Sequence, residues 1–156
     1  MEDRTCLDQF RQVLSQTADV LRELTRIEQQ KADAASQKQH QLMDGFLKEE
    51  QALMLKLRGL EQHRVKLSES LGFQDLTFRQ ILERADESIR EILSPLFASM
   101  TEETARLTQA KDTADRIIRL RLREMEAAIS RERGVSYEGS RNITGKMPTH
   151  FQDTYV

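Results

Sequence analysis

The chain has no tryptophan, only two prolines and a single cysteine among its 156 residues. One cysteine excludes an internal disulfide framework and a zinc site built from several thiolates. No apolar run approaches the roughly 20 residues that a membrane-spanning helix needs. The first residues also lack the basic stretch and apolar run of a signal peptide. We therefore expect a cytoplasmic protein without membrane insertion.

An excess of charge of one sign is also missing, since 24 Lys and Arg face 26 Asp and Glu. The formal net charge of -2 gives no overall field that attracts nucleic acid or an anionic membrane. Aromatic residues make up only 5% of the chain, whereas charged residues make up 32% and apolar residues 38%. This composition is typical of long helices around a thin core. We predict an all-α fold, an elongated antiparallel three-helix bundle resembling a coiled coil.

Apolar residues follow helical spacing in the first half of the chain. A first stripe has a period close to 3.5 residues and predicts a helix over 3–35 that packs on a partner helix. The polar residues 36–41 interrupt it and indicate a short turn. A second stripe predicts a helix over 41–71. The two stripes consist of Leu7, Phe10, Leu14, Thr17, Leu21, Leu24 and Ile27, and of Phe46, Leu53, Leu57, Leu60, Leu67 and Leu71.

Local signals mark the end of this second helix and the start of the next. Gly72 follows the last apolar residue and suits the left-handed conformation that ends a helix. Thr77 and Gln80 have the spacing of a capping box, in which each side chain satisfies a free backbone N–H. Leu76 and Ile81 flank this cap at the spacing of a hydrophobic staple.

The third helical pattern covers 77–133 and contains Pro95. A proline inside a helix costs about 3 kcal/mol and removes one hydrogen bond. We expect a kink or a short break near Pro95; the alternative is a new helix that Ser94 caps, with Pro95 as its first residue. Gly134 ends the helical region, so residues 1–133 form the bundle. Residues 134–156 are too poor in apolar residues for a core and are predicted to be a flexible C-terminal tail.

The middle of the chain resembles the FlgN family, the cytoplasmic chaperones of flagellar type III export. The resemblance is specific over Lys48–Glu83, in the sequences KEEQALMLKLRGLE, LG and LTFRQILE. The long last helix and the YEG sequence from Tyr137 also match the layout of the family. The resemblance implies a helical chaperone that binds the terminal helices of hook–filament junction proteins of the FlgK and FlgL type. It further implies that the last helix and the residues after it hold these helices, with Tyr137 as a candidate contact with the export gate.

A chaperone for helices needs an exposed apolar surface, because amphipathic helices are anchored through contacts at i, i+3, i+4 and i+7. The segment 117–122 has apolar residues on more than one face, whereas a two-helix contact uses only one stripe. The flexible methionines of the last helix also suit adaptable contacts. For all of these residues a place in the bundle core is the alternative. The candidate partner-binding residues are Leu96, Met100, Leu107, Ile117, Ile118, Leu120, Leu122, Met125 and Tyr137.

Three other functional classes have weaker support in the residues. Six arginines near the end of the last helix would suit a nucleic-acid partner, but interleaved glutamates and the helix dipole favour a solvated helix end. Heptad spacing alone would also suit a structural, self-associating coiled coil. Finally, no nucleophile motif, phosphate loop, paired histidines or paired-carboxylate site is recognisable. We therefore expect no enzyme activity, no cofactor, no metal site and no nucleic-acid partner.

Overall fold

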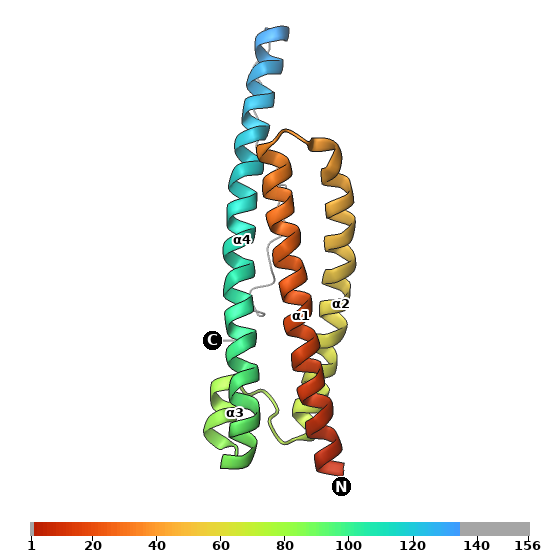
Figure 1. Cartoon of the computed structure of the whole chain (residues 1–156), viewed down its shortest axis with the longest axis vertical. Coiled ribbons are helices and arrows are strands. Elements are labelled where there is room, and N and C mark those ends of the chain that lie inside the picture. Colours follow the sequence, from red (N-terminus) through yellow and green to blue (C-terminus); the bar gives the residue numbers. More distant parts are fainter. Residues whose placement is uncertain (1, 135–156) are drawn as a thin grey trace.

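A computed structural model describes residues 2–134, and this part of the chain is a bundle of helices without strands. Three long helices run up, down and up, so that α2 is antiparallel to α1 and α4 (Figure 1). The predicted all-α bundle is therefore confirmed. The elements are α1 (Glu2–Ser36), a 3-10 turn η1 (His40–Leu42), α2 (Met43–Ser70), α3 (Phe78–Arg84) and α4 (Glu87–Arg133).

Helix α1 is the central helix, because it packs against both α2 and α4, which approach each other closely at few points. The most extensive contact is between α1 and α4, which run in the same direction (Figure 1). This position explains further buried residues of α1 that were not predicted. Val13, Val20 and Ala34 are buried and share a seven-residue spacing with Ile27 of the predicted stripe. They lie beside the predicted stripe and widen the buried face of α1.

The predicted boundary between the second helix and the next is confirmed. Gly72 has φ +82°, and the Phe73 N–H donates to the Ser68 carbonyl at 2.8 Å, which closes the end of α2. At the start of α3, the Gln80 N–H donates to Thr77 Oγ1, and the Thr77 N–H donates to Gln80 Oε1. Both halves of the capping box are thus present.

The break in the third helical segment lies ten residues before the predicted position. Helix α3 ends at Arg84, Ala85 is extended, and Asp86 caps α4 by accepting the Ile89 N–H at 3.0 Å. The Arg90 guanidinium also donates to the Leu82 and Ala85 carbonyls at the end of α3. Pro95 lies inside α4, which runs on without interruption, so no new helix begins there.

An aromatic cluster fills the base of the bundle, the end that carries α3. The rings of Phe78 and Phe97 stack at 4.0 Å, and Phe10 meets Phe97 edge-on at 6.2 Å. The Arg64 guanidinium lies 5.4 Å from the centre of the Phe78 ring. Helices α1, α2, α3 and α4 therefore meet at one well-packed site, which anchors the base.

Candidate partner-binding surface

The candidate residues of the last helix divide into two groups. Met100 and Leu107 are 0% and 3% exposed and belong to the hydrophobic core, beside half-buried Leu96. A partner could reach Met100 and Leu107 only if the bundle opened. Ile117, Ile118, Leu120, Leu122 and Met125 lie further along α4, and Tyr137 lies outside the described residues.

The end of α4 extends past the turn between α1 and α2 (Figure 1). The Arg121 guanidinium of α4 donates to the carbonyl of Ser36, the last residue of α1, at 3.0 Å. We call residues 122–133 the α4 extension. It ends at Gly134, whose φ is +65° and whose N–H donates to the Ser130 carbonyl at 2.7 Å. The extension is about 18 Å long at 1.5 Å per residue.

Apolar side chains at heptad-like steps run along α4 into the α4 extension. Ile118, Leu122, Met125 and Ile129 are separated by four, three and four residues, and we call them the α4 seam. By helical geometry the seam continues the face on which Leu107 and Ala114 pack in the bundle. The first two seam residues are half-buried, whereas Met125 and Ile129 are 43% and 40% exposed. The face that packs in the bundle thus continues into solvent.

Leu120 lies on a different face and is 54% exposed. The two-faced character predicted for 117–122 is therefore present in the structure. Ile117 is half-buried between these faces. Ile129 was not among the predicted contacts, but its position beyond the end of α1 exposes it.

The end of α4 is also locally basic. Residues 116–133 contain six arginines and three glutamates, which is a formal charge of +3 in a chain whose net charge is -2. Arg116, Arg119 and Arg123 are exposed, while Arg121 pairs with Glu124 at 2.8 Å. The apolar seam is therefore accompanied by positive charge, which favours an acidic partner.

A buried ionic cluster inside the bundle links the three long helices. Lys31 Nζ of α1 lies 3.2 Å from Glu28 Oε2 and 3.1 Å from Glu50 Oε2 of α2. Lys111 Nζ of α4 lies 3.5 Å from Glu50 Oε1 and 3.9 Å from Glu28 Oε1. Glu28 and Lys31 are 1% and 5% exposed. We call these four residues the ionic cluster.

Burial sets the protonation of this cluster. Burial, together with the hydrogen bond and negative charge of Glu50, raises the pKa of Glu28 from 4.5 to about 7 against the opposing effect of the two lysines. Burial also raises the pKa of Glu50, but the hydrogen bond with Glu28 and the charge of Lys31 outweigh it, so that this pKa is lowered. Glu28 is therefore the member that holds a proton near neutral pH.

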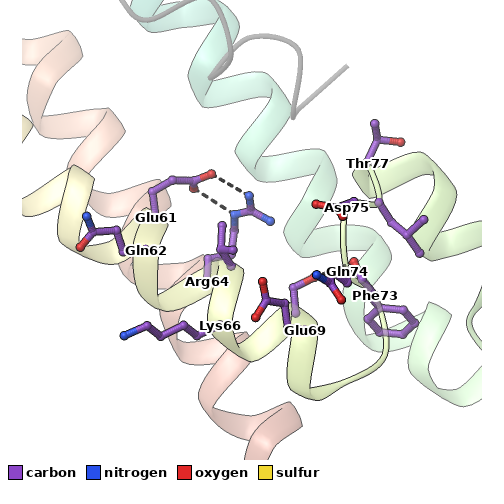
Figure 2. Close-up of a pocket in the computed structure, with 12 residues that line it drawn as sticks. Glu61, Gln62, Arg64, Lys66, Glu69, Phe73, Gln74, Asp75 and Thr77 are labelled. Carbon is purple, nitrogen blue, oxygen red and sulfur yellow. Dashed lines mark hydrogen bonds and ion pairs between the residues drawn. The ribbon is translucent and has the colours of Figure 1, made fainter.

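A cavity of about 960 Å³ lies between the end of α2 and the loop that leads to α3 (Figure 2). Arg64 and Glu61 form a two-point pair in its wall, at 2.9 and 2.6 Å. Val65, Phe73 and Leu76 supply apolar lining. This cavity could not be predicted from the sequence, because the 71–77 loop closes over α2 only in the folded chain. It can accept an apolar side chain between charged groups.

Residues 2–134 contain no group of three or more His, Cys, Asp or Glu side chains that could hold a metal ion. None of the helices in this range combines the length and the apolar content needed to cross a bilayer. No family model, no curated protein and no solved structure matches the chain.

Proposed function

We propose that this protein is a flagellar export chaperone of the FlgN type, which binds the terminal amphipathic helices of hook–filament junction proteins and delivers them to the export apparatus. The observation that carries the proposal is the α4 seam, whose outer half extends past α1 with its apolar side chains exposed. The sequence resemblance over Lys48–Glu83 supplies the client class. The assignment to the cytoplasm and the absence of enzyme activity are parts of the same proposal.

The seam indicates how a client would bind. A client helix that follows α1 on the same face of α4 would meet Leu122, Met125 and Ile129 over about two turns. Burial of apolar area contributes about 25 cal/mol per Å², and the ordering of the client offsets part of this gain. Binding should therefore be moderate, which suits a cargo that is released at the export gate.

The positive charge near the end of α4 also indicates the charge of the client helix. The local charge of +3 over residues 116–133 favours a client helix whose flanks carry Asp and Glu. Such pairs at the rim of an interface mainly affect the association rate and its dependence on salt. We therefore propose an acidic amphipathic helix as the client.

The test is binding of the C-terminal region of a FlgK- or FlgL-type protein, measured by calorimetry with the full chain. We expect a complex that the double variant Met125→Gln, Ile129→Gln weakens tenfold or more, since each residue contributes roughly 1–2 kcal/mol of apolar contact. Leu55→Gln is the matched control, because Leu55 is 68% exposed on α2 and away from the seam. Absence of a complex at about 50 μM protein would refute the proposal.

Self-association is the second candidate, and the heptad-like steps of the α4 seam favour it. In this case a second copy would cover Met125 and Ile129 and leave no seam for a client. Sedimentation over a range of concentrations separates the two functions. A stable dimer that the Met125→Gln, Ile129→Gln variant converts to monomer would support the structural coiled coil.

A further inference from the structure

The two ends of the bundle are held together by different interactions. At the base, the phenylalanine cluster joins α1, α3 and α4. At the far end, which carries η1, the last large apolar side chain of α1 in the core is Ile27. Beyond it α1 buries only Lys31 and three alanines, Ala32, Ala34 and Ala35, apart from Glu28 at the boundary. Alanine buries little apolar area, so the ionic cluster is the main large contact at the far end.

Such a contact gives less stability than an apolar core of the same size. The cost of removing charges from water offsets most of the attraction between them. Different parts of one fold can open with different free energies, and the part with fewer buried apolar contacts opens first. We therefore expect the far end to open at a lower free energy than the base.

The arrangement of the cluster makes its strength depend on one proton. Glu28 faces Lys31 on its own helix, Glu50 on α2 and Lys111 on α4. When Glu28 is neutral, its hydroxyl can donate to Glu50, and one negative charge faces two lysines. When Glu28 is ionised, two carboxylates share the same buried space with the two lysines. Lys31 Nζ donates to Glu28 Oε1 at 3.3 Å, whereas Glu28 Oε2 is buried and, although 3.2 Å from Lys31 Nζ, has no hydrogen bond of good geometry.

We infer that the ionic cluster is a proton-sensitive latch, which holds the far end of the bundle closed when Glu28 is neutral and loosens it when Glu28 is ionised. Opening separates the end of α1 from α4 and uncovers Ala114 and Ile118. Ala114 continues the α4 seam inward from Ile118, its first member, so the open state offers a longer apolar face. The latch itself depends only on the cluster; its use in client binding rests on the proposed function.

Hydrogen exchange of backbone amides, followed by NMR between pH 5 and 7.5, tests the latch in the full chain. After correction for intrinsic exchange, far-end amides of residues 28–36 should open more readily than base amides of residues 10–24. Their opening constant should rise on the order of 50-fold over this range, because each unit of difference in pKa between closed and open states is a factor of ten. Base amides exchange through global unfolding and should show a much stronger dependence on urea.

Two variants separate the latch from a general effect of charge. Glu28→Gln keeps a neutral donor toward Glu50 and should make far-end opening nearly independent of pH. Glu103→Gln is the matched control, because Glu103 is also buried, at 5% exposure, but pairs with Arg22 and Arg106 nearer the base. It should leave the pH dependence of the far end unchanged.

Three results would overturn the latch. One, measured on the wild-type protein alone, is a far-end opening constant that does not change from pH 5 to 7.5. Another is a common opening constant and urea dependence for the far-end and base amides. The third is an unchanged pH dependence in a folded Glu28→Gln variant. Client binding need not be measured, so failure of the latch and failure of the chaperone function remain distinguishable.

Discussion

Phe97→Ala should be one of the most destabilising substitutions in this chain. Phe97 is 3% exposed, stacks on Phe78 at 4.0 Å and meets the edge of Phe10 at 6.2 Å. Removal of a buried phenylalanine ring typically costs about 3–5 kcal/mol, which includes the cavity left behind. We expect about 4 kcal/mol here, because helices α1, α3 and α4 contribute rings to this site and cannot all move inward to fill it.

Urea unfolding followed by circular dichroism at 222 nm measures this loss as a change in the free energy of unfolding. The melting temperature should fall by roughly 8–16 °C, at about 2–4 °C per kcal/mol for a chain of this size. Phe46→Ala is the matched control, because Phe46 is only half-buried on α2. The double variant Phe78→Ala, Phe97→Ala should cost about 0.5–1.5 kcal/mol less than the sum of the two single changes, because each single change already removes the stacking energy.

The prediction is refuted if Phe97→Ala lowers the free energy of unfolding by less than about 1 kcal/mol, or by no more than Phe46→Ala does. Either result would show that the base of the bundle is not held by the stacked rings. A coupling near zero would show that the stacking of Phe78 on Phe97 contributes nothing beyond burial.

Two further changes test the local structure of α4. Pro95→Ala should raise the free energy of unfolding, measured in urea, by about 1–3 kcal/mol. The reason is that Pro95 lies inside a continuous helix, where alanine restores the hydrogen bond to the Glu91 carbonyl. A loss of stability would instead mean that the geometry of the proline is needed to position the core residues beside it. Asp86→Asn should remove one pH dependence near the acid end. The Ile89 N–H, and after it the Ser88 hydroxyl, hold the pKa of Asp86 below 3.8. A lowered native pKa contributes stability above pH 3.8, which is lost as the pH falls through the native value. The stability of the wild type relative to Asp86→Asn should therefore decline below about pH 4, and a constant difference from pH 7 to pH 2 in urea unfolding would contradict this account.

Local chemistry allowed much of the fold to be predicted. The Gly72 stop and the Thr77–Gln80 capping box depend on residues within a few positions of each other, so the sequence contains all that is needed to recognise them. The Asp86 cap is equally local, because Asp86 accepts the N–H of Ile89 three residues later, but the break was predicted near Pro95 instead. A proline in an exposed helix position is tolerated when packing on both sides holds the helix, and here Leu93 and Phe97 are both buried.

The candidate site could be predicted only in part. Met100 and Met125 both follow the helical pattern of α4, yet one is 0% and the other 43% exposed. The difference depends on where α1 ends alongside α4, and the period of the α4 stripe carries no information about that. The ionic cluster was equally hidden, because Glu28, Glu50 and Lys111 are typical surface residues of their helices when each is read alone.

The sequence by itself determined the helices, their caps and the absence of a large aromatic core, because these follow from periodicity, neighbouring residues and composition. Only the tertiary structure decided that α1 is central, that α4 continues past it, and that four charges from three helices meet in one buried cluster. The physical reason is that helix formation is local, whereas burial depends on which helices lie alongside each residue. A leucine or methionine of the α4 stripe is buried where α1 runs alongside it, and is a candidate contact beyond Ser36, the last residue of α1.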